Sequence, residues 1–343
     1  MTATLPVNDE STVRKLGLLS VVVPCFNEED VILETLRQLN ETLGSSLSLP
    51  YELVFVDDGS RDATLLLLTK AAQTDPRIRA ISFSRNFGHQ AAVTAGLKFA
   101  RGDAIVMIDA DLQDPPAVIP RMVAAWERGY DVVYGVRAVR KGETAFKRFS
   151  AAMFYRMLQS MSDVEIPVDT GDFRLIDRRV VEVLGSMPER DRFLRGMIAW
   201  AGYRQIGLPY EREARFAGES KYPLRKMIKF AIDGVSSFSI GPLRLAIWLG
   251  FAAATLSVAM IIYAVIVRLT TDSWVPGWAA LFVAVMFMGG VQLLAIGVIG
   301  EYVGRLFVQA KARPLFLVDQ VIEGSTVVRG SVHAVAGETQ HVA

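Results

Sequence analysis

The chain has 343 residues and a formal net charge of +1 at pH 7, so its charge gives no indication of a nucleic-acid partner. Its length predicts one large domain or two smaller ones. The single cysteine, Cys25, cannot form an internal disulfide, which is typical of a reducing compartment. The hydrophobic content of 51% is high for a soluble enzyme, and the excess lies after residue 244.

The first part of the chain alternates patterns typical of strands and of helices. Short apolar runs predict strands at residues 18–24, 51–56, 78–84, 104–108 and 131–136, and amphipathic stretches predict helices at 28–43, 62–73, 88–100 and 116–128. Short strand–helix units of this kind predict an α/β fold with a mostly parallel, Rossmann-like sheet and helices on both faces. Further along, a helix is predicted at 143–161, an irregular segment at 169–176, then two short helices and a strand near 203–211.

Two carboxylates follow the apolar run Ala104–Ile108 at the carboxyl end of a predicted strand. Asp109 and Asp111 are two residues apart, so an extended chain points both to the same side. Open α/β sheets bind their ligands at this edge, and Mg²⁺ takes one or two carboxylates together with water and phosphate oxygens. The pair therefore predicts a site for a metal-bound nucleoside diphosphate; the alternative is two solvated aspartates in a turn.

The first two predicted strands also end in polar residues. Asn27 is predicted to cap the helix that follows it, with Glu28 in an acidic first turn. Asp57 and Asp58 precede Gly59, which permits a sharp turn, and Ser60 or Asp62 then starts a helix. One aspartate would suffice for capping, so the second is available to a nucleobase or ribose. Ordinary helix capping remains the alternative.

Four segments together resemble the family 2 glycosyltransferases with the GT-A fold. They are residues 23–29 (VPCFNEE), 56–64 (VDDGSRDAT), 85–88 (RNFG) and 109–116 (DADLQDPP), in the order and spacing of that family. More narrowly, the chain resembles the polyprenyl-phosphate glycosyltransferases, the group of dolichol-phosphate mannose synthase and the bacterial undecaprenyl-phosphate glucosyltransferases. The resemblance extends from about Ser20 to Pro314.

This resemblance implies roles for the matching positions. The nucleotide sugar, UDP- or GDP-linked, would be bound by Pro24, Asn27, Glu28, Asp57, Asp58, Asp109 and Gln113. Asp109 and Asp111 would bind Mg²⁺ or Mn²⁺ on its diphosphate. Asp111 and Asp172 would be catalytic, with Asp172 on the acceptor side; a turn aspartate is the alternative for Asp172.

The chemistry of a lipid phosphate acceptor favours basic residues over a strong general base. The second pKa of a phosphate monoester is near ~6, so the group is already largely dianionic at neutral pH. It needs cations that position it, and the Arg fork and the Lys ammonium both serve. The basic candidates are Arg137, Arg148, Arg215 and Lys221, and the neutral Ser220 is predicted to bind the same phosphate. Taken singly, such residues are more often surface charges.

Two uncharged runs, 245–267 and 278–300, are long enough to cross a bilayer as a helical hairpin. A buried hairpin in a soluble protein is the alternative. Basic residues flank the pair while the connection 269–277 carries none, so the positive-inside rule places both termini and the large domain in the cytoplasm. The predicted parts are a flexible N-terminus (1–17), a GT-A domain (18–220), interfacial amphipathic helices (221–244), the hairpin (245–300) and a cytoplasmic tail (301–343) whose last ~20 residues fray.

The sequence thus predicts a plasma-membrane enzyme that transfers a sugar, with inversion, from a nucleotide sugar to undecaprenyl, decaprenyl or dolichyl phosphate. A processive polysaccharide synthase is disfavoured because two spans are few and the Gln-x-x-Arg-Trp motif is missing. A non-catalytic membrane scaffold is disfavoured because both chelating aspartates are present. The sugar, the nucleotide, the polyprenol length and assembly into homo-oligomers stay open.

Overall fold

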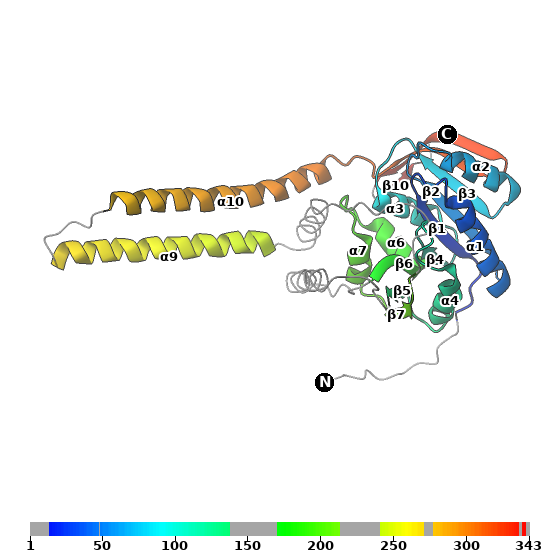
Figure 1. Ribbon diagram of the computed structural model, residues 1–343, viewed down its shortest axis with the longest axis horizontal. Helices are drawn as coiled ribbons and strands as arrows, with labels where there is room; N and C mark the ends of the chain where they lie inside the picture. Colours follow the sequence, from blue (N-terminus) through cyan, green and yellow to red (C-terminus); the bar gives the residue numbers. More distant parts are fainter. Residues whose placement is uncertain are drawn as a thin grey trace. The chain divides into compact units, whose positions relative to one another are not determined.

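A ten-stranded sheet in the order β10-β9-β8-β3-β2-β1-β4-β6-β5-β7 organises most of the chain outside two long apolar helices (Figure 1). The computed structural model describes residues 14–47, 49–137, 170–212, 241–270, 277–335 and 338–340. The chain divides into two units, of which one contains the sheet and the other contains the apolar helices.

The centre of the sheet is parallel, as the strand–helix alternation predicts. Four strands pair in the spatial order β3-β2-β1-β4: β1 (Leu19–Cys25), β2 (Tyr51–Asp57), β3 (Ile78–Phe83) and β4 (Ala104–Met107). Their side chains are buried on both faces, which explains the nearly continuous apolar runs. The observed bounds lie within one or two residues of the predicted ones.

Helices cover both faces of this sheet. One face carries α1 (Ile32–Ser46), α2 (Thr64–Thr74), the short 3-10 helix η1 (Pro116–Val118) and α4 (Ile119–Glu127), whose apolar side chains share one core. In that core Leu39, Leu68 and Met122 pack with alternate strand residues such as Val21 and Phe55. On the other face lie α3 (His89–Phe99), α6 (Arg178–Ser186) and α7 (Leu194–Trp200). The two short helices predicted after residue 176 are α6 and α7.

Residues 170–177 form a strand, and the prediction of an irregular segment there was wrong. This strand, β6 (Thr170–Asp177), runs antiparallel between β4 and β5 (Val132–Arg137), and β5 pairs in parallel with β7 (Gln205–Tyr210). The charged residues within it disguise the strand pattern. Arg174 is only 3% exposed, and its guanidinium donates to the Gly171 carbonyl at 2.9 Å.

The predicted fraying of the C-terminal tail was also wrong for the described residues. β8 (Leu317–Glu323), β9 (Thr326–Val335) and β10 (Glu338–Gln340) extend the sheet, with β8 antiparallel to β3. Phe316 is fully buried and stacks on Phe83 with ring centroids 5.0 Å apart. The Glu323 carboxylate accepts from Arg101 at 2.6 Å. These strands are stabilised by pairing with their neighbours in the sheet more than by their own composition.

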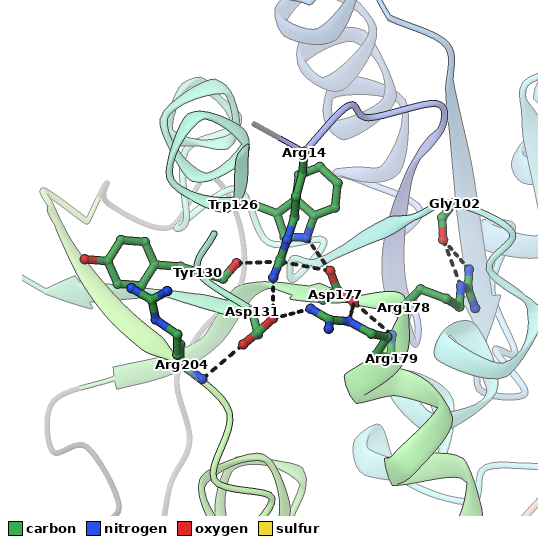
Figure 2. A network of polar contacts seen from close by, with 9 residues as sticks. All are labelled: Arg14, Gly102, Trp126, Tyr130, Asp131, Asp177, Arg178, Arg179 and Arg204. Carbon is green, nitrogen blue, oxygen red and sulfur yellow. Dashed lines mark hydrogen bonds and ion pairs between the residues drawn. The ribbon is translucent and has the colours of Figure 1, made fainter. Parts of the chain in front are cut away.

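The described end of the predicted N-terminal tail is fixed by an ion-pair network at the amino edge of the strands (Figure 2). The Arg14 guanidinium lies 2.8 Å from the Asp131 carboxylate and 3.1 Å from that of Asp177. The Trp126 indole also donates to Asp177, at 2.9 Å, and Arg179 pairs with both carboxylates. Residues 1–13 lie outside the described part of the chain.

Replacing Arg14 with Ala is expected to destabilise the fold without disabling catalysis. The change removes charge-assisted hydrogen bonds to two nearly buried carboxylates, but Arg179 still pairs with both. We therefore expect a loss of about 1–2 kcal/mol in the free energy of unfolding. Thermal unfolding of the detergent-solubilised protein, with initial transfer rates measured at low temperature, checks this. An unchanged melting temperature together with a lost rate would contradict it.

The two apolar helices form the second unit. They are α9 (Gly241–Thr270) and α10 (Trp278–Ala310), which lie side by side (Figure 1). The stretches Ala246–Val267 and Leu281–Ala310 are long and apolar enough to cross a membrane, and almost none of their side chains are buried. Such a surface is typical of lipid contact and rules out the core hairpin of a soluble protein. The predicted helix at 143–161 and residues 221–240 of the predicted interfacial segment lie outside the described residues.

Candidate active site

The predicted acidic residues come together at one edge of the sheet, where the parallel strands end. Asp57 ends β2, and Asp109 and Asp111 follow β4. Because β6 runs antiparallel to β4, with Arg174 opposite Met107, its first residues lie at this same edge. Asp172 therefore belongs to the same site as the aspartates of the two preceding motifs.

The loop after β1 is tied to the loop after β2. Asn27 has a φ of 55°, its backbone N–H donates to the Ser60 hydroxyl at 2.9 Å, and its side-chain oxygen accepts from the Arg61 N–H at 2.9 Å. The Glu28 N–H donates to the Thr64 hydroxyl at 2.8 Å. The prediction that Asn27 caps the next helix was wrong, because α1 begins only at Ile32. Asn27 instead joins two loops of the site.

Asp57 and Asp58 are buried and brace the neighbouring loops. The Asp57 carboxylate accepts from the Ser60 N–H at 3.1 Å and from the Ser82 hydroxyl at 3.0 Å. Asp58 accepts from the backbone N–H groups of Phe87 (2.6 Å) and Gly88 (2.9 Å). Burial raises the pKa of Asp58, and those two N–H groups oppose the shift. The two carboxylates thus fix the loop after β2 against the end of β3 and the loop that follows it, and Pro24 lies in the neighbouring strand β1.

Gly59 allows the turn after β2 to approach the loop after β3. Its φ is 68°, and a Cβ there would lie 2.5 Å from the Arg85 carbonyl carbon. Any other residue would both strain the backbone and push the loop away. The predicted sharp turn at Gly59 is confirmed. The following helix starts at Thr64, whose N–H donates to the Asp62 carboxylate at 3.0 Å, so Asp62 is the side chain that supports its first turn.

Asp109 and Asp111 form the open part of the site. The Asp109 side chain is 35% exposed. The Asp111 carboxylate accepts from the Gln113 N–H at 3.2 Å across a tight turn in which Leu112 has a φ of 57°. Loss of hydration raises the pKa of Asp109 to about 6, and the charges of neighbouring carboxylates add to the rise. Burial, more than the neighbouring charges, therefore disfavours the ionised form of Asp109.

Asp172 is surrounded by nitrogen donors from other elements. Its carboxylate lies 3.1 Å from the Arg195 guanidinium, 3.3 Å from His89 Nε2 and 3.4 Å from the Gln90 amide nitrogen. Burial alone would raise the pKa of Asp172, but the His89 hydrogen bond and the Arg195 charge outweigh it and lower the pKa well below its usual range. Asp172 is therefore an ionised, oriented carboxylate and not a loose turn residue.

His89 connects the two acidic groups. Its Nε2 lies 3.7 Å from the Asp109 carboxylate as well as 3.3 Å from that of Asp172. Burial alone would lower the pKa of His89, but the hydrogen bond to Asp172 and the charge of Asp109 outweigh it and raise the pKa. Sequence reasoning missed the contributions of His89, Gln90 and Arg195. The available signal for the first two was their position directly after the RNFG motif.

A second polar group lies at the ends of β5 and β7. It consists of Arg137, Tyr210, Arg212 and the buried Asp114, which closes the DADLQD segment. Of the predicted phosphate-binding residues, only Arg137 falls within the described part of the chain. Arg148, Arg215, Ser220 and Lys221 lie outside the described residues.

Comparison with known proteins identifies the family. The Glycosyl transferase family 2 domain matches residues 20–185, and the GtrB C-terminal hairpin matches residues 241–306. YkcC of Bacillus subtilis, named as an uncharacterized glycosyltransferase, is 48% identical over 301 residues, covering 88% of this chain and 93% of that protein. The chain belongs to glycosyltransferase family 2. The predicted GT-A fold class and the predicted enzyme class are thereby confirmed.

One further relative and one solved structure are also similar to this chain. The bactoprenol glucosyl transferase of Shigella phage SfV is 40% identical over 305 residues, covering 88% of this chain and 97% of that protein. Among solved structures, S. aureus TarS 1–349 in complex with UDP-GlcNAc matches at 18% identity and a TM-score of 0.44, covering 64% of this chain and 65% of that one. The hairpin match and the exposed apolar helices together identify a membrane protein.

Proposed function

We propose that this glycosyltransferase transfers a sugar, with inversion, from a UDP- or GDP-linked nucleotide sugar to a polyprenyl phosphate. The observation that carries the proposal is the convergence of Asp109, Asp111 and Asp172 at one sheet edge, in a chain whose two exposed apolar helices match the GtrB hairpin. Relatives named as bactoprenol glucosyl transferases support the acceptor class. No observation favours the two alternatives, a processive polysaccharide synthase and a non-catalytic membrane scaffold.

The donor side fits Mg²⁺ or Mn²⁺. Asp109 and Asp111 supply hard oxygen ligands at the partly exposed part of the site, two residues apart after the carboxyl end of β4. Such a cation, when bound, neutralises the charge that develops on the leaving diphosphate. Gln113, just beyond the turn, would contact the same group, and Asp57 and Asp58 would hold the nucleoside.

The acceptor side fits a nucleophile that arrives already ionised. A phosphate monoester is largely dianionic at neutral pH, so no side chain has to remove a proton. Asp172 stays ionised beside Arg195, and its charge would stabilise the positive charge that develops on the sugar ring as the bond to the leaving group breaks. Arg137 would hold the acceptor phosphate, as we also propose for Arg148, Arg215, Ser220 and Lys221.

The charge pattern of the chain favours a cytoplasmic site. Basic residues flank the hairpin, including Arg305, Lys311 and Arg313, whereas the connection 269–277 carries none. We therefore place the sheet-containing unit and both termini on the cytoplasmic side of the plasma membrane. Nucleotide sugars and the ionised headgroup of the lipid would meet there.

A donor panel tests the proposed function. The detergent-solubilised full chain is incubated with polyprenyl phosphate, Mg²⁺ and each of several radiolabelled UDP- and GDP-sugars, and lipid and polymer fractions are counted. We expect label in a lipid with one donor. Label that appears only in a polymer would instead identify a processive synthase, and no label in any fraction would favour a scaffold.

A further inference from the structure

Tyr210 links a buried carboxylate to the arginine proposed to hold the acceptor. The Tyr210 hydroxyl donates to the Asp114 carboxylate. Arg137 lies opposite Tyr210 in the neighbouring parallel strand β5. Burial raises the pKa of Tyr210, the charge of Asp114 adds to the rise, and the positive charge of Arg137 acts to lower the pKa. The phenol therefore keeps its proton and keeps donating to Asp114. The three side chains form one polar series, in which Tyr210 is next to Arg137 on one side and hydrogen-bonded to Asp114 on the other.

Two glycines leave the space that this series occupies. A Cβ at Gly135 would lie 2.7 Å from the Tyr210 ring, and a Cβ at Gly171 would lie 2.8 Å from the Arg137 guanidinium. The ring also packs edge-on against Phe173, with centroids 5.6 Å apart. The Arg137 guanidinium thus lies against the residue that directly precedes Asp172.

Some polar atoms in and beside this series have no hydrogen-bond partner. Within the described residues, the buried Nε atoms of Arg137 and Arg212 have no hydrogen-bond acceptor. One oxygen of the Asp114 carboxylate likewise has no hydrogen-bond donor there. Arg212 Nε lies 3.7 Å from the other Asp114 oxygen. Buried N–H groups without acceptors are uncommon in a finished structure. The two unpaired Nε–H groups therefore point to an anion as their missing partner.

We propose that Asp114 and Tyr210 are positioning residues that orient the Arg137 guanidinium toward the phosphate of the lipid acceptor. This inference rests on the proposed function and extends it to two residues with no direct contact to substrate. Asp114 closes the loop that begins with Asp109. The loop 109–114 on the donor side and Arg137 on the acceptor side are therefore held by one set of contacts. These contacts would keep the two substrates correctly placed relative to each other.

The test compares Tyr210→Phe and Asp114→Asn with the wild type. Losing one charge-assisted contact that orients Arg137 is expected to lower kcat/KM for polyprenyl phosphate by roughly 5- to 30-fold, mostly through KM. The affinity for UDP or GDP with Mn²⁺, measured by titration calorimetry, should not change. In the Arg137→Ala background, Tyr210→Phe should have almost no further effect, because the group that it positions is gone.

Tyr51→Phe is the matched control. Tyr51 is also buried and donates to a side chain, Asn40 at 2.9 Å, but it begins β2 at the opposite edge of the sheet. It should leave the acceptor KM unchanged. Additive effects of Tyr210→Phe and Arg137→Ala, or weakened nucleotide binding, would overturn the inference while leaving the proposed function intact. Absence of any lipid product from the wild type would overturn both.

Discussion

Replacing Asp111 with Asn is expected to lower turnover by about 10²- to 10³-fold, the size of effect seen when a preorganised charge-stabilising group is removed. Asp111 follows β4 at the open end of the site, and its amide replacement still fits the turn that accepts the Gln113 N–H. What disappears is the second carboxylate charge beside Asp109. With a single carboxylate left, a divalent cation is held less tightly and neutralises the leaving diphosphate less well.

Initial rates at saturating donor and acceptor, with Mg²⁺ or Mn²⁺ varied, measure this effect. EDTA should abolish transfer by the wild type, and either cation should restore it. Asp103→Asn is a matched control, because the Asp103 carboxylate accepts from the Gly17 (2.8 Å) and Leu18 (3.0 Å) N–H groups at the opposite edge of the sheet. Full wild-type turnover in excess EDTA would exclude the metal.

Replacing Asp172 with Asn is the second large effect that we expect, a fall in kcat of about 10²-fold. The neutral amide cannot stabilise positive charge on the sugar ring. It also leaves Arg195 and the buried Arg174 without their nearest anion. Burial already lowers the pKa of Arg174 to about 10, so the change should cost stability as well.

Kinetics and thermal unfolding, measured together, separate the loss of kcat from the loss of stability in Asp172→Asn. Arg195→Ala should lower kcat less than Asp172→Asn does, because the carboxylate remains and His89 still donates to it. Asp75→Asn removes the acid of another Asp–Arg pair, 2.7 Å from Arg77 at the amino edge, and should change neither rate nor KM. A kcat for Asp172→Asn within twofold of the wild type would remove Asp172 from the catalytic group.

Local patterns were sufficient to predict the central strands, their helices and the edge at which the acidic motifs meet. β6 and β8–β10 were not predicted, for two physical reasons. Arg174 and Asp172 interrupt the apolar pattern of β6, and their burial is tolerable only because partners from other elements surround them. The C-terminal strands depend on the pairing of β8 with β3, more than 200 positions earlier in the chain, and no short window of sequence shows such a partner.

In the candidate site too, some residues could be predicted from local sequence and others could not. Asp109, Asp111 and Asp172 were predicted, from local motifs and from the resemblance to a family. The residues that contact Asp109 and Asp172 come from elsewhere: His89 from α3 and Arg195 from α7. Each is an ordinary polar residue in its own segment. Only the fold, through β6 lying between β4 and β5, brings these side chains beside the aspartates.

The central claim is that sugar is attached to the phosphate oxygen of a polyprenyl phosphate. ³¹P NMR of the lipid, before and after incubation of the purified full chain with its nucleotide sugar and Mg²⁺, tests this directly. We predict that the phosphomonoester signal converts to a phosphodiester signal, with a mass increase of one sugar, and that Asp111→Asn prevents the conversion. A monoester signal that persists while nucleoside diphosphate is released would contradict the account.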